Sequence, residues 1–141
     1  MIRTVAVPTV VTVILLAAGC ASSMPTPRTL AQAGSVLERH VGGTWQEEGT
    51  NPDIGPVLVL KERPPQMDAG FFGVFPFPYD DAGREKLALF MGRRSAPLYV
   101  LGFSDSYTVI TWVRRTNEVS QSVITALHLS VPERDYERPE R

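Results

Sequence analysis

The chain of 141 residues contains a single cysteine, Cys20, which lies at the end of an apolar N-terminal run. The segment 1–3 gives a short positive start, and residues 5–18 are almost entirely apolar or threonine. With one thiol, the chain can form neither an internal disulfide nor a cysteine-rich zinc site. The folded part must therefore be stabilised by its apolar core, without a covalent cross-link.

The residues that lead to Cys20 read LLAAGC at 15–20, and they resemble the signal peptide and lipobox of bacterial lipoproteins. The family pattern often has Leu three residues before the cysteine, where this chain has Ala17. The resemblance implies that residues 1–19 are removed and that Cys20 becomes the acylated first residue. An ordinary secretory signal or an uncleaved anchor helix is the alternative. The run is shorter than the roughly 20 apolar residues of a spanning helix, and it contains Pro8.

The same resemblance implies where the protein is attached. More than one acyl chain of the palmitate type makes a membrane anchor effectively permanent. Ala21 follows Cys20, whereas in enterobacteria-like sorting an Asp at that place retains a lipoprotein in the inner membrane. We therefore expect a lipid-anchored protein of the bacterial cell envelope, held in the outer membrane and facing the periplasm.

The rest of the chain has the length of one domain. Residues 20–34 carry the lipid-bearing cysteine and then small, polar or proline residues, which predicts a flexible tether. Residues 35–131 are the expected β domain, and 132–141 form a charged tail. The formal net charge is −1, without a basic stripe, so we expect no nucleic-acid partner.

A short helix is predicted at the start of the domain. Ser35 and Glu38 have the spacing of a capping box, and Gly42-Gly43 offers a stop. The helix is therefore expected over residues 36–41.

Beyond this helix the apolar residues repeat every second position, which is typical of β-strands. The predicted strands span residues 44–48, 56–62, 70–77, 86–91, 98–103, 106–115 and 121–131. A turn at 116–118 would join the last two. Seven strands without intervening helices predict an all-β antiparallel meander. It would close as a small up-and-down barrel, or form a half-open barrel or sandwich, with one short N-terminal helix.

Two segments are similar to the lipocalin or wider calycin group. Gly43-Thr44-Trp45 is a G-x-W at the start of the first strand, and 99–107 is similar to a later strand-turn-strand segment. The resemblance implies a barrel in which Trp45 closes one end and a basic residue past the last strand stacks on it. Arg134 is the matching candidate. The alternative is that Trp45 is an ordinary core aromatic and Arg134 belongs to a solvated tail.

The sequence contains no recognisable catalytic or metal-binding motif. His40 and His128 are the only histidines, and no zinc-binding or phosphate-binding motif accompanies them. We place His40 near the end of the helix and His128 on the last strand. Asp80-Asp81 and the segment 104–106 are interpreted as turns. We therefore expect no enzyme activity, no cofactor and no metal.

The segment 71–79 holds four of the six phenylalanines of the chain. In a strand, Phe71, Phe75 and Phe77 share one face and Phe72 points to the other. The segment is either a core strand that runs into a proline-rich turn or an apolar surface for a ligand or partner. On the second interpretation the candidate binding residues are Phe71, Phe72, Phe75, Phe77, Tyr79 and Tyr99.

These observations favour a non-enzymatic interaction or accessory module of the envelope, whose partner is another envelope protein. The alternative is a lipocalin-like carrier of a small apolar or lipid ligand. A carrier requires an internal cavity, which would be lined by Phe71, Phe75, Tyr99, Val109 and Leu127.

Overall fold

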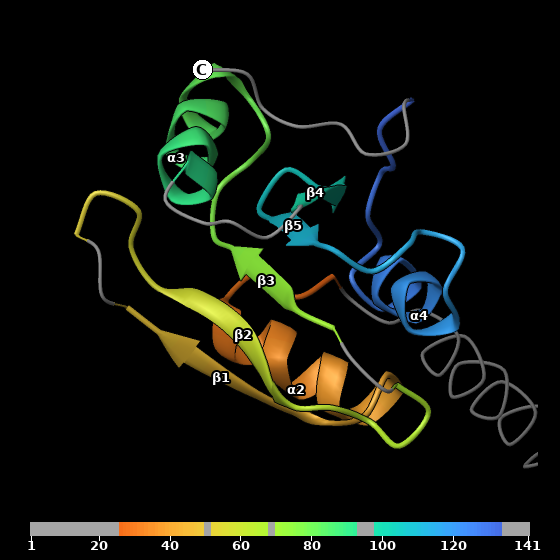
Figure 1. The fold of residues 1–141 in the computed structure, drawn as a ribbon. Coiled ribbons are helices and arrows are strands. Elements are labelled where there is room, and N and C mark those ends of the chain that lie inside the picture. Colours follow the sequence, from red (N-terminus) through yellow and green to blue (C-terminus); the bar gives the residue numbers. More distant parts are fainter. Residues whose placement is uncertain (1–25, 50–51, 68–69, 93–97, 134–141) are drawn as a thin grey trace, which may run out of the picture.

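The structure is a computed structural model, and it describes residues 26–49, 52–67, 70–92 and 98–133. The described residues form one five-stranded antiparallel sheet and three helices (Figure 1). In chain order the elements are α2 (Leu30–His40), β1 (Thr44–Glu48), β2 (Val57–Glu62), β3 (Phe72–Phe75), α3 (Asp81–Gly92), β4 (Tyr99–Phe103), β5 (Thr108–Thr111) and α4 (Glu118–Ala126).

The sheet has the strand order β1-β2-β3-β5-β4, and every neighbouring pair is antiparallel. Because β1 and β4 lie at opposite edges, the sheet is open and is not closed into a barrel. The prediction of an antiparallel sheet is confirmed. The prediction of an all-β meander barrel, and the barrel implied by the lipocalin resemblance, are wrong.

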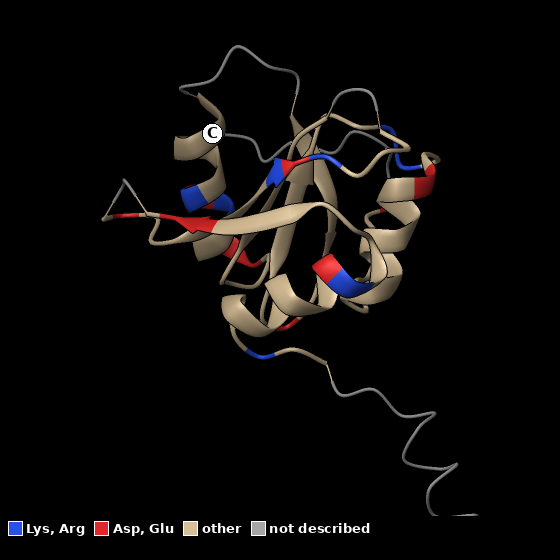
Figure 2. Cartoon of the chain, turned by 90° about the horizontal axis from the view of Figure 1, so that it is seen from below, with Lys and Arg blue, Asp and Glu red and all other residues tan. Residues whose placement is uncertain are grey.

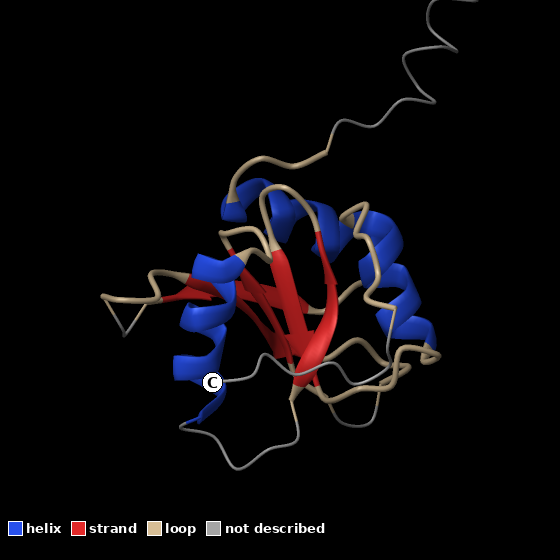
Figure 3. Ribbon diagram, turned by 90° about the horizontal axis from the view of Figure 1, so that it is seen from above, coloured by secondary structure: helices blue, strands red, loops and turns tan. Residues whose placement is uncertain are grey.

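Helices cover both faces of the sheet (Figure 3). α2 packs on β1 and β2, α4 packs on α2 and β4, and α3 lies on the opposite face. Two apolar clusters result, one on each face. The first includes Leu37, Trp45, Leu58, Phe72, Val109, Val123 and Leu127, and the second includes Val57, Phe75, Phe77, Leu87, Val100 and Ile110.

Helix α2 begins at Leu30 rather than after Ser35, so residues 30–34 belong to the folded domain and not to the tether. The side chain of Thr29 caps the helix by accepting a hydrogen bond from the Gln32 amide at 3.1 Å. Leu30, Ala33 and Leu37 are buried, at the three- and four-residue spacing that places them on one face. The predicted stop is confirmed, because Gly42 follows with a φ of +93° and donates to the Leu37 carbonyl at 3.0 Å.

Five of the seven predicted strands exist, most of them with shorter bounds than the pattern indicated. The predicted strand 86–91 is wrong, because these residues lie within α3. Asp80 starts this helix: its carboxylate accepts a hydrogen bond from the Gly83 amide at 2.8 Å. Gly83 and Leu87, four residues apart, are the buried positions of α3, which is a helical spacing.

The predicted strand 121–131 is also wrong, because most of it forms α4. Asn117, which we placed in a hairpin turn, is the N-cap of this helix, and its side chain accepts from the Val119 amide at 2.8 Å. Only a single bridge remains of the predicted strand, between Ser130 and Phe103 at the β4 edge.

None of the helices in the described ranges is long and apolar enough to cross a membrane. Basic and acidic residues are interspersed over these elements (Figure 2). The lipid-attachment residue Cys20 lies outside the described residues, as does Arg134, the predicted stacking partner of Trp45.

Candidate functional site

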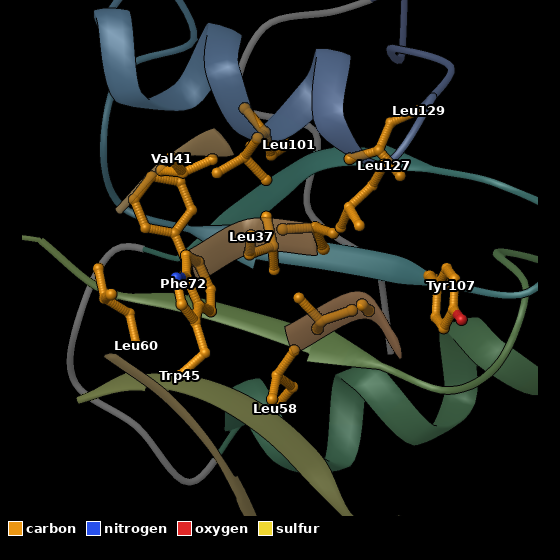
Figure 4. Close-up of a cluster of buried hydrophobic side chains, with 14 of the residues drawn as sticks. Leu37, Val41, Trp45, Leu58, Leu60, Phe72, Leu101, Tyr107, Leu127 and Leu129 are labelled. Carbon is orange, nitrogen blue, oxygen red and sulfur yellow. The ribbon is translucent and has the colours of Figure 1, made fainter. Parts of the chain in front are cut away.

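The phenylalanines of 71–77 alternate between the two faces of β3 as predicted, but most of them are core residues. Phe72 is fully buried in the first cluster, where its ring centroid lies 6.1 Å from that of Trp45 (Figure 4). Phe75 and Phe77 are buried in the second cluster, on the other face. A side chain that is surrounded by core residues cannot contact a partner. The core interpretation therefore holds for these three residues.

The other predicted binding residues are distributed between core and surface. Tyr99 is 1% exposed, and its hydroxyl donates to the Val113 carbonyl. Tyr79 is half-buried between the Phe103 ring, 5.4 Å away, and the Arg84 guanidinium, 4.7 Å away. Phe71 is half-buried against the second cluster. The six residues do not converge on one surface.

The residues predicted to line a carrier cavity are separated by the sheet. Phe71 and Phe75 pack in the second cluster, whereas Val109 and Leu127 pack in the first. Residues on opposite faces of one sheet cannot line a common cavity.

Trp45 is buried in the first cluster. Its indole Nε1 donates to the Gly42 carbonyl at 3.1 Å, and its backbone amide donates to the Glu38 carboxylate at 3.1 Å. These bonds tie the end of α2 to the start of β1.

The candidate site is a groove between α2 and α4, with a volume of about 500 Å³. We call it the α2–α4 groove. Its lining residues are Val36, His40, Glu118, Gln121, Ser122, Thr125, Ala126 and His128. None of them belongs to the aromatic segment that the sequence singled out.

Helical periodicity explains which residues line the groove. On α2, Val36 and His40 are four residues apart and share one face. On α4, Glu118, Ser122 and Ala126 follow the same spacing, while Val119 and Val123 are buried in the first cluster. Each helix therefore packs an apolar face on the sheet and presents a mixed face to the groove.

The groove brings together the only two histidines of the chain, which are far apart in sequence. The predicted place of His40, at the end of its helix, is confirmed. The placement of His128 on a strand is wrong. His128 follows α4 and has a φ of +54°. The next amide, that of Leu129, donates to the Ile124 carbonyl at 3.0 Å. This is a Schellman motif, in which glycine usually occupies the place that His128 has here.

Most polar side chains of the groove are available to a ligand. Gln121 Nε2 donates to the Arg115 carbonyl at 2.7 Å. The side chains of His40, Ser122, Thr125 and His128 form no hydrogen bond or ion pair with another described residue. The groove therefore offers imidazole, hydroxyl and carboxylate groups beside the apolar Val36 and Ala126. Within the described ranges, no group of three or more His, Cys, Asp or Glu residues is placed to hold a metal ion.

No family model, no curated protein and no solved structure matches this chain.

Proposed function

We propose that this chain is a lipid-anchored protein of the bacterial cell envelope, attached through Cys20 to the outer membrane and facing the periplasm. Its folded domain acts as a non-enzymatic interaction or accessory module. The observation that carries the interaction role is the α2–α4 groove, most of whose polar side chains are exposed.

The composition of the groove supports binding of a partner. Two imidazoles, two hydroxyls and one carboxylate can donate or accept hydrogen bonds, and the apolar residues between them can bury part of a ligand. The walls come from helices whose other faces are fixed in the core. A site held by rigid elements loses little conformational entropy when it binds.

The hydrogen bonding of the groove favours binding over nucleophilic catalysis. A serine or threonine nucleophile needs an adjacent base that accepts its proton. Ser122 and Thr125 form no such bond with His40, His128 or any other described residue. The hydroxyls are therefore available to hydrogen-bond a ligand.

Site-specific photo-crosslinking in cells tests this function. A photoreactive amino acid replaces Ser122 in the groove, or Ser35 on the exposed side of α2 as the matched control. We expect one discrete adduct from position 122 and none from position 35. The adduct should be lost when Thr125→Arg narrows the groove.

Two results would contradict the proposed role. One is an absence of adducts from position 122 in protein that folds normally. The other is an adduct pattern that is the same from both positions, or that persists after Thr125→Arg.

A further inference from the structure

The two tryptophans of the chain have different environments. Trp45 is 6% exposed, whereas Trp112 is 42% exposed. Trp112 directly follows β5, and its ring centroid lies 6.4 Å from that of Phe71, which packs on the second cluster. The indole is therefore supported on one side by the core and open to solvent on the other.

A basic side chain lies close to this indole along the chain. Arg114 is exposed, and its guanidinium forms no ion pair with another described residue. Tryptophan is enriched at the headgroup level of bilayers because its ring is apolar and its N–H is polar. A neighbouring arginine is attracted by the phosphates of anionic lipids. This pair therefore has the chemistry of a membrane interface.

The geometry of the chain allows Trp112 to reach the bilayer that would hold Cys20. The Tyr107 hydroxyl donates to the Pro27 carbonyl at 2.8 Å, which fixes the start of the folded domain beside β5. The extended chain from Tyr107 to Trp112 spans roughly 17 Å. The chain from Cys20 to Pro27 reaches at most about 25 Å. The maximum reach of the segment 20–27 therefore exceeds the length of chain between Tyr107 and Trp112.

We infer that Trp112, Phe71 and Arg114 form a membrane-contact patch, and that it binds the lipid surface to which Cys20 attaches the chain. The inference rests on the lipid attachment proposed above. An exposed indole beside a cationic arginine, on a chain with a proposed lipid attachment at Cys20, fits a lipid surface. α2 and α4 lie on the opposite face of the sheet from the second cluster (Figure 3). Contact through the patch leaves the α2–α4 groove open.

Tryptophan fluorescence of the acylated full chain tests this inference. Trp45→Phe leaves Trp112 as the only tryptophan. The chain is reconstituted into vesicles of phosphatidylethanolamine and phosphatidylglycerol and compared with the same chain after removal of the acylated N-terminal peptide. We expect a shift of the Trp112 emission to shorter wavelength and a loss of acrylamide quenching on the vesicles. If Trp45→Phe does not fold, the difference between the unmodified chain and Trp112→Phe gives the same signal.

The control moves the reporter to the other face. Ser35→Trp, in a chain with Trp45→Phe and Trp112→Phe, should stay accessible to acrylamide on the vesicles. Arg114→Gln should reduce the Trp112 shift on vesicles with phosphatidylglycerol and not on vesicles of phosphatidylcholine alone.

The outcomes separate the two proposals. A chain that is bound to vesicles but leaves Trp112 fully quenchable overturns the membrane patch and leaves the lipid anchor intact. A chain that does not associate with vesicles overturns both. Protection of Trp112 that rises with protein concentration without lipid indicates self-association, and it also overturns the patch.

Discussion

The Tyr107 hydroxyl donates a hydrogen bond to the Pro27 carbonyl, 2.8 Å away and 80 positions earlier in the chain. It also lies 3.1 Å from the carbonyl of Thr29, the N-cap of α2. The ring is buried in the first cluster. One residue therefore connects the sheet, the first helix and the segment that leads from Cys20 into the domain.

Tyr107→Phe should lower the free energy of unfolding by about 1 kcal/mol, the net value of a typical hydrogen bond. The ring stays packed, and the hydroxyl's contacts with the Pro27 and Thr29 carbonyls are lost. Urea denaturation measures the change, and hydrogen exchange should show faster opening near the start of α2. Ser106→Ala, at an exposed neighbour, should change stability by less than about 0.5 kcal/mol. Equal stability of Tyr107→Phe and the unmodified chain would contradict this role.

Stability should also fall at alkaline pH because of Tyr107. Burial raises the pKa of its hydroxyl above the ordinary value of 10.0. Below pH 10.0 both the folded and the unfolded chain keep the proton, so the stabilisation is complete. Above that value the unfolded chain loses the proton first, and stability declines until the pH passes the folded pKa. Denaturation from pH 8 to 11 should show a shallower decline in the free energy of unfolding for Tyr107→Phe than for the unmodified chain. An identical decline in both would show that the Tyr107 hydroxyl does not cause it.

Ser120 has a fully buried hydroxyl that finds no hydrogen-bond partner among the residues the structure describes. Ser120→Ala should raise the free energy of unfolding by about 1–2 kcal/mol, because it removes an unsatisfied polar group and places a better helix former in α4. Ser122, on the same helix, is half-buried at the groove. Ser122→Ala should therefore raise the free energy of unfolding only through helix propensity, by less than about 0.7 kcal/mol. Thermal denaturation of both variants would show the difference, and a loss of stability in Ser120→Ala would reveal a partner for the hydroxyl.

His128 has a left-handed backbone conformation, with a φ of +54°, which costs a non-glycine residue about 1–2 kcal/mol. His128→Gly should therefore raise the free energy of unfolding by about 1 kcal/mol. His128→Ala keeps the strained backbone and should give no gain. Chemical denaturation of both variants tests this prediction. If both raise the free energy of unfolding by the same amount, backbone strain is not the cause.

The sequence pattern placed five strands correctly, but it extended β3 and β5 beyond their observed ends. β3, β4 and β5 are short, and almost all of their residues are buried, so apolar and β-branched residues dominate them. β1 follows a different pattern, with Trp45 as its one buried residue. The other four residues of β1 are exposed, at one edge of the sheet.

The same pattern failed at α4 because its sequence is rich in residues that favour strands. Val119, Val123 and Ile124 are β-branched, yet Val119 and Val123 are four residues apart and pack on the first cluster as helix positions. Packing therefore outweighed propensity. The N-cap Asn117 was the local signal that could have corrected the prediction.

The candidate groove could not be predicted because its two walls are distant in sequence. His40 and His128 come together only when α4 packs beside α2. Once His128 was assigned to a strand, nothing in the sequence placed it near His40. The aromatic segment was the more visible feature, but its composition reflects a strand with core on both faces.

Mass spectrometry of the intact protein from cell membranes tests the central proposal most directly. We expect a mature chain that begins at Cys20 and carries the mass of acyl chains on that residue. Cys20→Ser should remove this mass and release the protein from the membrane fraction. A native chain that still begins at Met1, or that is cleaved elsewhere and carries no lipid, would contradict the account.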